Sequence, residues 1–466
     1  MEWNTEEVLK NLADIVGSQW VKIESADLNR YGKDWTTNLN PKPSAVVLPA
    51  SIEEIQAIVL FANERKIPLV ASGGRTGLSG GSVAVNHELI VAFDRMNKIM
   101  GFNAADRLVF CQPGVITEQL QKFAEEKELF YPVDFASSGS SQLGGNAATN
   151  AGGIKVIRYG MTRNWIQGMK VVTGEGKLLD LNRGLTKNAT GYDFRHLFIG
   201  SEGTLGFIVE LTVRLSSFPK DPTVVLLGLN NFTEVTAVLN AFQKKLNLTA
   251  FEFFSDKALQ YVVEENALQR PFDSTCEFYT LIEFENETSF DLEIAQSTFE
   301  YCFNQGWVLD GTISHSTSDA NKLWRFREDI TASISKYSPY KNDISVRVSL
   351  VPAFLKELDE LLSLVYPEFE TLFFGHIGDG NIHVNILKPS NITTEVFYKK
   401  CEEVTGIIFD LVQKFGGSIS AEHGIGVLKK PYLRYSRSDE EIIYMKAIKR
   451  VFDPNNIMNP GKLIDA

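Results

Sequence analysis

The alternation of strand-like and helix-like segments begins twice in this chain, once on each side of residues 216–222, a stretch with two prolines. At 466 residues the chain exceeds what one hydrophobic core usually holds, so two or three domains are expected. The restart of the pattern predicts a domain boundary at residues 216–222. The hydrophobic content of 44% and the charged content of 22% are ordinary for a globular protein.

The first half begins with a strand–helix–strand unit, in which residues 45–48 and 69–71 have strand patterns. Between them Ser51 and Glu54 form a capping box, and four apolar residues share one helical face: Ile55, Ile58, Val59 and Ala62. Further strands are expected at residues 89–93, 108–111 and 205–215, with a hairpin at 169–181 and a helix capped by Thr117 that ends near Glu126. Residues 131–160 show no periodicity, and an irregular stretch of this length is usually functional.

The second half repeats strand, helix and strand with antiparallel returns. Strands are expected at residues 224–229, 250–254, 278–284 and 307–312, with helices near 234–245 and 290–304. A third pass begins at Ile344 and ends in a hairpin that contains two histidines. This order predicts an α+β domain with ferredoxin-like topology. After Gly426 we expect one amphipathic helix and then residues 454–462, packed back on the first domain.

The acidic balance, a net charge of −12, argues against nucleic acid or an anionic membrane as the main partner, because both need basic faces. The four cysteines (Cys111, Cys276, Cys302 and Cys401) form no CxxC pair, which argues against an iron–sulfur cluster or a zinc knuckle and favours a reducing compartment. Neither a signal peptide nor a run of about 18 apolar residues is visible. We therefore expect a cytoplasmic protein, at most peripheral to a membrane.

Three glycine-rich segments lie in the first half, at residues 73–81, 139–153 and 200–206. Backbone amides in such loops can approach a pyrophosphate without Cβ clashes. Residues 73–81 lack the GK[ST] of a P-loop and the GxGxxG of a dinucleotide fingerprint, and a strand rather than a helix follows them. A structural glycine-rich turn is the alternative for each segment taken alone, whereas the three together favour a long dinucleotide.

A tight turn at Gly378-Asp379-Gly380 separates two expected strands, residues 372–376 and 382–387. His383 and Asn385 share one face of the second strand, and His376 ends the first. Two imidazoles with one carboxylate are a familiar metal arrangement, and Glu422 is the natural third ligand, which leaves His423 as an acid or base. Ordinary hydrogen-bonded polar residues at a turn are the alternative.

The chain resembles a known family over residues 35–466. The matching motifs are Pro43 with residues 46–49, residues 73–81, 132–134, 144–153, 158–160 and 200–206, the histidine hairpin, and residues 421–426 and 459–462. They resemble the vanillyl-alcohol-oxidase-type (PCMH-type) flavoproteins, and most closely the FAD-linked D-2-hydroxy-acid dehydrogenases, which include D-lactate, glycolate and D-2-hydroxyglutarate dehydrogenases.

The resemblance implies an α+β fold. It divides the chain into an N-terminal helical segment (1–40), a two-subdomain FAD-binding domain of the PCMH type (41–217), a ferredoxin-like substrate or cap domain with the metal site (218–425), and a C-terminal helical segment that packs on the FAD domain (426–466). It also implies an FAD whose pyrophosphate lies on residues 73–81. Because these residues include neither His nor Cys, we expect the FAD to be non-covalent. The implied FAD contacts are Gly73, Gly74, Arg75, Thr76, Gly77, Leu78, Ser79, Gly80, Gly81, Pro132, Gly144, Gly145, Asn146, Thr149, Gly152, Gly153, Glu202, Gly203, Gly206, Ile208 and Asn459.

The resemblance also implies site roles in the second half. It assigns His376, His383 and Glu422 to a divalent metal, Zn or Mn, His423 to proton abstraction, and Asn385 to the substrate. A hydroxyl on a metal loses its proton more easily, and an imidazole in its ordinary titration range suits the role of base that the resemblance gives to His423. Hydride would then leave Cα for flavin N5.

A carboxylate substrate also needs cations. Arg327, in Trp324-Arg325-Phe326-Arg327-Glu328, falls on the family's substrate arginine, and its planar fork suits a carboxylate. A salt bridge along the helix is its alternative role. Lys341 aligns with a basic residue that some members place near the substrate, whereas Arg75 is expected to be structural or to face the pyrophosphate. Arg347 stands near a position where the family usually has proline, facing either substrate or, as we favour, solvent.

The expected function is FAD- and metal-dependent oxidation of a D-2-hydroxy acid to the 2-keto acid. Because no second redox centre is visible, electrons would pass to an external quinone, cytochrome or electron-transfer flavoprotein. The competing readings are a flavin subunit of the glycolate-oxidase type, acting mainly within a larger electron-transfer complex, and a flavin-free metal hydrolase. Residue patterns do not discriminate D-2-hydroxyglutarate from D-lactate or glycolate, and a homodimer is expected by analogy only. His87, His196 and His315 are expected to be structural or loop residues.

Overall fold

The computed structural model describes residues 3, 5–36 and 38–465, and the chain divides into two compact units. Unit 1 comprises Met1–Gly153, Met161–Phe218 and Glu422–Ala466. Unit 2 comprises Ile154–Gly160 and Pro219–Ala421. Each unit is therefore assembled from segments that are distant in the sequence.

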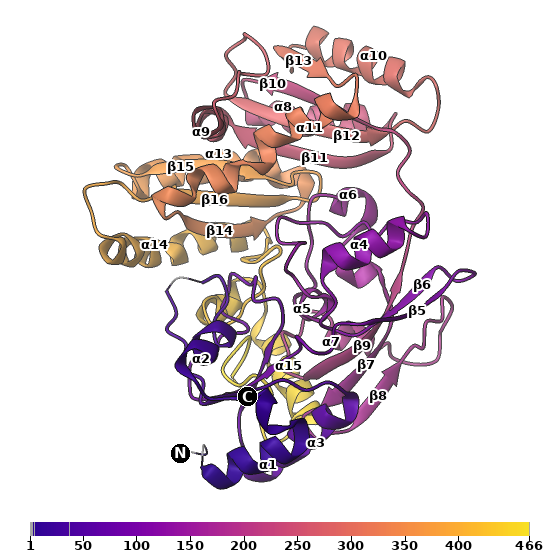
Figure 1. The fold of residues 1–466 in the computed structure, drawn as a ribbon. Helices are drawn as coiled ribbons and strands as arrows, with labels where there is room; N and C mark the ends of the chain where they lie inside the picture. The colour runs from indigo at the N-terminus through magenta and orange to yellow at the C-terminus, as the bar shows by residue number, and fades with distance from the viewer. Residues whose placement is uncertain (1–2, 4, 37, 466) are drawn as a thin grey trace. The chain divides into compact units, whose positions relative to one another are not determined.

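Unit 1 contains a four-stranded sheet in the order β1 (Val21–Lys22), β2 (Ala45–Val47), β4 (Leu89–Ala92), β3 (Leu69–Ser72). The last three strands are parallel, and β1 is antiparallel to β2. Helix α3 (Ile52–Arg65) joins β2 to β3 and begins after Ser51, whose side chain accepts the N–H of Glu54. The helix buries the four residues expected for its apolar face, so this strand–helix–strand unit is confirmed. Helix α1 (Glu6–Val16) lies beside α3 at the lower end of unit 1 in Figure 1 and shares its core.

A second, antiparallel sheet of unit 1 has the order β5 (Ile99–Asn103), β6 (Leu108–Cys111), β9 (Gly206–Arg214), β7 (Ile166–Thr173), β8 (Leu178–Leu181). The pairing of β7 with β8 confirms the expected hairpin around residues 174–176. Val172, Phe207 and Val209 of this sheet share the core beneath α3, so both sheets of unit 1 rest on one apolar interior.

Two expectations for unit 1 are wrong. Helix α4 (Thr117–Glu125) is capped at Ile116, and Thr117 is its first residue because the Thr117 hydroxyl is held 2.8 Å from Ser141 Oγ. Residues 131–160 are not irregular throughout, since they contain α5 (Leu143–Thr149) and α6 (Val156–Tyr159). Helices of one or two turns are too short to show apolar periodicity in sequence.

The C-terminal segment of unit 1 contains α15 (Asp439–Phe452), which begins at a capping box of Ser438 and Glu441. Beyond it the backbone runs along β3: the N–H of Leu69 donates to Ile457 O at 2.7 Å, and the N–H of Asn459 donates to Leu69 O at 2.8 Å. The edge of the parallel sheet is thereby covered by residues near the end of the chain. The shorter helices of unit 1 are α2 (Ser25–Tyr31) and α7 (Arg195–Phe198).

Unit 2 is built on one seven-stranded sheet in the order β13 (Asp310–Ile313), β10 (Pro222–Leu229), β12 (Phe278–Glu285), β11 (Leu248–Ser255), β15 (Glu370–Gly375), β16 (Asn381–Leu387), β14 (Tyr340–Ser345). Neighbouring strands are antiparallel throughout. The strands therefore alternate with helices as expected, and the α+β class is confirmed.

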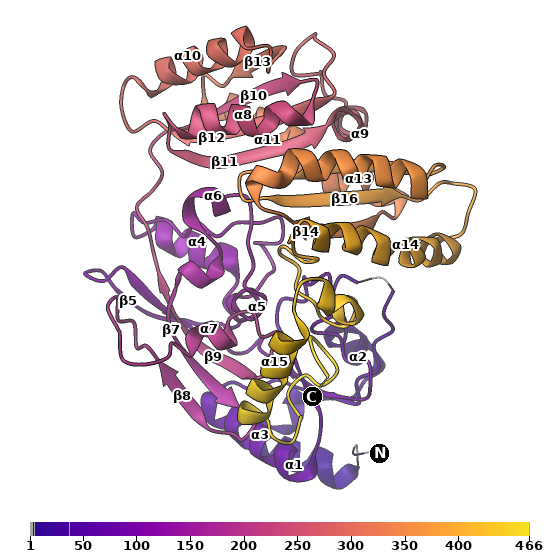
Figure 2. The same ribbon diagram turned by 180° about the vertical axis from the view of Figure 1, so that it is seen from behind.

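Helices cover both faces of this sheet. On one face α9 (Asp256–Asn266), α11 (Thr317–Glu328) and α12 (Ile330–Ile334) share a core with Leu226, Phe254 and Leu281. On the other face, Phe232 of α8 (Phe232–Gln243) contacts Phe253, Phe278 and Phe373. Figure 2 shows α13 (Val351–Val365) and α14 (Thr394–Lys414) running along β16 and β14, and α10 (Asp291–Asn304) lies farther along the unit. None of the described helices is long and apolar enough to cross a membrane.

Candidate active site

The glycine-rich loop at residues 73–81 connects β3 to β4 and lies against the start of α5. A Cβ on Gly74 would lie 2.4 Å from Ser140 O, so no side chain fits there. A Cβ on Gly73 would lie 3.9 Å from the Cα of Gly145, which places these two glycine segments side by side. The sequence alone did not show that they meet.

Gly145 borders open space. A Cβ built there meets no heavy atom of the described residues within 4 Å. Beside it, the buried Oε1 of Gln142 has no hydrogen-bond partner among the described residues and lies 3.4 Å from a Cβ built on Gly73. Room next to bare backbone, bordered by an unsatisfied polar atom, fits a polar ligand that approaches the main chain closely. The expected FAD pyrophosphate is such a group.

The Arg75 side chain forms an ion pair with an acidic residue of the same unit. Its guanidinium nitrogens lie 3.1 and 3.0 Å from the two carboxylate oxygens of Asp94, and its Cζ lies 5.0 Å from the centre of the Tyr31 ring. Of the two roles left open by the sequence, this bidentate pair favours the structural one.

The segment that follows Glu422 is fastened to the same loop within unit 1. The Ser79 hydroxyl donates to His423 O at 2.8 Å, and Ser79 O accepts from the N–H of Val427 at 3.0 Å. The Glu202 carboxylate accepts from Ile425 N and Gly426 N, both at 2.8 Å. Burial raises the pKa of the Glu202 carboxyl, and these two hydrogen bonds oppose the rise. The backbone around His423 is thus fixed from two sides.

Asn459 links the parts of this arrangement. Its side-chain amide donates to Gly81 O at 2.8 Å and to Glu202 O at 2.7 Å, while its Oδ1 is buried without a hydrogen-bond partner among the described residues. Asp34, which sequence reasoning missed, accepts the N–H of Gly80 at 3.0 Å and lies beside Gly77. Residues at both ends of the chain therefore hold the expected flavin loop.

The other expected FAD contacts mainly shape the backbone around the loop. Asn146 donates to the Thr117 hydroxyl at 2.7 Å, and the Thr149 hydroxyl donates to Gly145 O at 3.1 Å. A Cβ on Gly153, where φ is +142°, would lie 2.0 Å from Asp134 O. Pro132, Gly144, Gly152, Gly203, Gly206 and Ile208 are buried or partly buried in the same unit, and Thr76 and Leu78 are partly buried in the loop itself.

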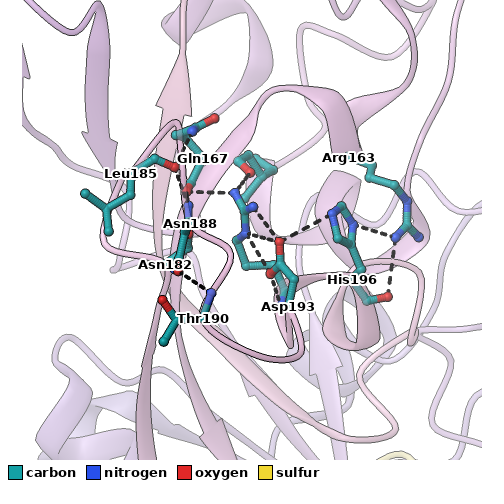
Figure 3. A network of polar contacts seen from close by, with 10 residues as sticks. Arg163, Gln167, Asn182, Leu185, Asn188, Thr190, Asp193 and His196 are labelled. Carbon is teal, nitrogen blue, oxygen red and sulfur yellow. Dashed lines mark hydrogen bonds and ion pairs between the residues drawn. The ribbon is translucent and has the colours of Figure 1, made fainter.

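His196 belongs to a polar network on unit 1 rather than to this site. Its Nδ1 lies 2.8 Å from Arg163 Nη1, and its Nε2 lies 3.6 Å from Asp193 Oδ2. Burial is the main cause that lowers the pKa of His196, and the nearby arginines act in the same direction. Figure 3 shows this network tying the 182–196 loop to the body of the unit, which supports the structural role expected for His196.

The histidine hairpin of unit 2 is confirmed, with β15 and β16 paired in antiparallel register. Phe374 and Asp343 are the cross-strand partners of His383, on β15 and β14 respectively. Lys341 is the cross-strand partner of Asn385. Directly opposed residues project from the same face of a sheet, so Lys341 and Asn385 lie beside His383 on that face.

The two histidine rings of the hairpin are neighbours, with centroids 5.2 Å apart and planes at 87°. His376 Nδ1 lies 2.9 and 2.8 Å from the two carboxylate oxygens of Glu252. His383 Nδ1 lies 3.6 Å from Asp343 Oδ1, which is too long for a hydrogen bond. Because a carboxylate accepts a proton-bearing Nδ1, the His376 ring can turn Nε2 toward a metal. This donor set fits a divalent cation.

Acidic groups surround the hairpin. The pKa of Asp379, in the turn, is raised to about 6, chiefly by burial and to a smaller extent by the neighbouring Glu252 and Asp343, while His376 and the N–H of Asn381 oppose the rise. Asp343 also accepts from the Asn381 amide at 2.9 Å.

Arg327 of α11 reaches the same face of the sheet. Its side chain is buried, its Nε lies 2.8 Å from Glu252 Oε2, and its Cζ lies 4.9 Å from the centre of the Phe374 ring. Arg327 therefore forms a buried ion pair with Glu252 on this face. A planar guanidinium beside the two histidines suits an anionic ligand such as a carboxylate.

Glu422 and His423 belong to unit 1, whereas the two hairpin histidines belong to unit 2. Glu422 directly follows Ala421, whose N–H lies 3.4 Å from Asp343 O in unit 2. The metal set of His376, His383 and Glu422 therefore remains a prediction, as does the base role of His423. Arg347 is exposed just before a short 3-10 helix, Val348–Leu350, which favours its solvent-facing alternative.

Glu252 and Asp343 are the acidic residues of unit 2 that sequence reasoning missed. Glu252 is the one charged residue of β11, a strand that is buried along its whole length. Such a residue is a usable signal, because a buried carboxylate needs a partner.

The fold is similar to that of two solved enzyme structures. It matches 4-ethylphenol oxidase from Gulosibacter chungangensis with a TM-score of 0.79 and 17% identity, covering 100% of this chain and 98% of that one. It matches p-cresol methylhydroxylase with a TM-score of 0.76 and 16% identity, with the same coverage. These matches confirm the PCMH-type fold. Residues 43–182 match the family model of the FAD binding domain, and residues 218–463 match that of the FAD linked oxidases, C-terminal domain. Fold and domains together define an FAD-linked oxidoreductase.

Relatives of similar length refine this class. A protein named D-2-hydroxyglutarate dehydrogenase from Stutzerimonas stutzeri is 58% identical, with 98% of this chain and 99% of the relative covered. One of the same name from Xanthomonas citri is 50% identical, with 99% and 98% covered. A putative D-lactate dehydrogenase from Schizosaccharomyces pombe is 35% identical, with 95% and 85% covered. The chain belongs to the FAD-linked D-2-hydroxy-acid dehydrogenase family, as its motifs indicated.

Proposed function

We propose that this protein oxidises D-2-hydroxyglutarate to the 2-keto acid, using non-covalent FAD and a divalent metal, Zn or Mn. The substrate is inferred from the names of the two relatives at 58% and 50% identity. D-lactate, named for the relative at 35% identity, is the competing substrate. In either case the C2–H bond breaks with its electron pair, the hydroxyl loses a proton, and a C=O bond forms.

The observation that carries this proposal is the buried Arg327, which lies on the sheet face that bears His376 and His383 and pairs there with Glu252 at 2.8 Å. Arg327 binds a substrate carboxylate through its planar fork. Lys341, opposite Asn385, offers a second cation for the distal carboxylate of a dicarboxylic acid. The side-chain amide of Asn385 contacts the substrate in this proposal. D-lactate has no distal carboxylate for Lys341 to bind.

His376, His383 and Glu422 hold the metal in this proposal, and when bound it lowers the pKa of the hydroxyl it touches. His423, next to Glu422 in the chain, takes the hydroxyl proton. The hydrogen bond from Ser79 to His423 O and those from the Ile425 and Gly426 amides to Glu202 keep that histidine in place. FAD, when bound along residues 73–81 and 144–153, accepts the hydride.

Electrons then leave for an external acceptor, and we propose a quinone, a cytochrome or an electron-transfer flavoprotein in the cytoplasm or at the membrane surface. By analogy with the family, we also propose that the protein forms a homodimer. The purified protein is mixed with limiting substrate and one candidate acceptor at a time, and the flavin absorbance is recorded. The acceptor that restores the absorbance of the oxidised flavin is the one that the enzyme uses.

The test of the proposed function is a kinetic survey with an artificial dye acceptor. We expect the protein to be yellow, and kcat/KM for D-2-hydroxyglutarate to exceed that for D-lactate, glycolate and L-2-hydroxyglutarate. The substitution R327M should lower kcat/KM by about 100-fold or more, the range seen when one charge-stabilising donor is lost. A preference for D-lactate would overturn the substrate assignment but leave the reaction class intact.

Arg325 provides the matched control for Arg327. It lies on the same helix, but its side chain is 46% exposed and pairs with Asp329 at 3.0 Å. R325M should therefore keep kcat/KM near the wild-type value. Equal losses in R325M and R327M would show that the helix, not the buried guanidinium, matters.

A further inference from the structure

Glu252 lies at the centre of the site face of unit 2, although neither the motifs nor the relatives' names assign it a role. It sits in the middle of β11, and only 1% of its surface is exposed. One of its oxygens is within 2.8 Å of both His376 Nδ1 and Arg327 Nε, and the other is 2.9 Å from His376 Nδ1. A single buried carboxylate thus contacts a proposed metal ligand and the proposed substrate arginine.

We infer that Glu252 is a positioning residue that holds His376 and Arg327 in one fixed arrangement for metal and substrate. The inference rests on the proposed function, because it concerns the same site. Glu252 would have two tasks: it sets the tautomer of His376, and it fixes the orientation of the Arg327 guanidinium.

The first part of this task concerns the tautomer of His376. A carboxylate can only accept, so the hydrogen on the imidazole must be on Nδ1, and the lone pair is then on Nε2. A carboxylate behind a ligating imidazole also fixes the ring and increases its basicity. Without Glu252, His376 can rotate or carry its proton on Nε2, and it is then a poor ligand.

The second part concerns charge. Arg327 is buried and permanently cationic, so it would repel a dication bound at the neighbouring His376. The Glu252 carboxylate lies against both groups and offsets the positive charge. Together with the Phe374 ring below the guanidinium, it also restricts the direction in which the remaining N–H groups of Arg327 can point.

Glu283 is a close internal control. It is also a buried glutamate on this sheet, on the neighbouring strand β12, where its cross-strand partner is Ala250. Its carboxylate accepts from Trp324 Nε1 at 2.9 Å and forms an ion pair with Lys155. The described contacts of the Glu283 carboxylate are with Trp324, Lys155 and Thr249, so its loss removes a buried acidic group without touching the proposed metal ligands.

The experiment compares E252Q with E283Q in the full-length FAD-loaded protein. Zn²⁺ affinity is measured by competition with a chromophoric chelator, and KM and kcat are measured separately. We expect E252Q to bind Zn²⁺ about 10- to 100-fold more weakly, as loss of the partner behind a ligating histidine typically does. We also expect a higher KM for the hydroxy acid, because Arg327 is no longer oriented. E283Q should keep its Zn²⁺ affinity within about twofold of wild type.

E252D covers the case in which E252Q does not fold. It keeps the charge but shortens the side chain by one methylene, so it should fold and still weaken Zn²⁺ binding more than E283Q does. Wild-type Zn²⁺ affinity and KM in a folded E252Q or E252D would overturn the inference. A wild-type protein that binds no Zn²⁺ or Mn²⁺ and does not oxidise D-2-hydroxyglutarate would instead overturn the proposed function. These two failures are therefore distinguishable.

Discussion

Lys462 forms an ion pair with Glu88 at 2.6 Å, and the two side chains are 0% and 2% exposed. Glu88 stands directly before β4 of unit 1, and Lys462 lies close to the end of the chain. Their pairing fixes the C-terminal segment against the parallel sheet, and Asn459, three residues earlier, reaches Gly81 in the glycine-rich loop. The stability of this pair therefore bears on the proposed flavin loop.

Removal of Lys462 should be strongly destabilising. K462M leaves Glu88 buried and unpaired, which costs about 3–5 kcal/mol when one partner of a buried pair is lost. Urea unfolding of the purified protein measures this loss. Lys430 is the control, since its ion pair with Asp465 is at the surface, with side chains 24% and 70% exposed. K430M should cost about 0–1 kcal/mol, and equal losses in both variants would contradict the prediction.

Gly145 should be critical for FAD but not for folding. In G145A the new methyl group enters the open space beside Gly73, where it displaces the expected pyrophosphate without a clash within the protein. We expect a folded variant whose flavin content falls at least tenfold, measured by the ratio of flavin to protein absorbance after gel filtration. G139A is the control, because its Cβ meets only Glu118 Oε2 at 3.7 Å. Full flavin content in G145A would exclude this space as the cofactor site.

Asp34 should give the protein a defined acid dependence. Burial raises the pKa of its carboxyl above the ordinary 3.8, although hydrogen bonds from Thr36 and Gly80 oppose the rise. The native state therefore binds a proton at pH values where the unfolded state has released it. This contribution to stability is present below pH 3.8 and decreases as the pH rises through the raised pKa.

The measurement for Asp34 is the difference in unfolding free energy between D34N and wild type from about pH 4 to 7. The change common to all other carboxyl groups cancels in this difference. We expect D34N to improve relative to wild type as the pH increases across this window. A difference that does not vary with pH would show that the Asp34 pKa is not raised in the native protein.

The four cysteines should not react with thiol reagents in the native protein. All four are buried, and burial raises the pKa of Cys276 and Cys302 to about 11 and that of Cys111 and Cys401 to about 12. At pH 8 about one thiol in a thousand or fewer is then the reactive thiolate. A chromogenic disulfide should label none rapidly in the native protein and all four in urea. Rapid labelling of one thiol without denaturant would contradict this.

Local patterns were enough to predict much of the fold. The N-cap at Ser51, the apolar face of α3 and the hairpin of β15 and β16 depend on residues close in sequence, and all three are confirmed. The expected capping box is only half formed, because the Glu54 carboxylate accepts from the N–H of Ala50 instead of that of Ser51. Thr117 was misjudged because its hydroxyl contacts Ser141, 24 residues away. α5 was missed because two turns do not establish a period.

The site was less accessible to sequence reasoning, since its supporting residues are distant in the chain. Glu252 contacts His376 across 124 residues, through the pairing of β11 with β15, which no local pattern predicts. Asp34 and Asn459 reach the glycine loop from opposite ends of the chain. Motifs indicated the groups that could react, whereas the residues that hold them in place required the three-dimensional pairing.

The backbone of Ile457 and Asn459 beside β3 has a consequence for biosynthesis. Until residues 457–459 have left the ribosome, β3 lacks this partner and has an open edge, and an open parallel edge can pair with other chains. The first half of the nascent polypeptide must therefore wait in an incomplete state, in which chaperone binding or aggregation competes with folding. A truncation at the 216–222 boundary would make that incomplete state permanent. The first half of the chain is therefore not expected to fold when it is expressed without the second.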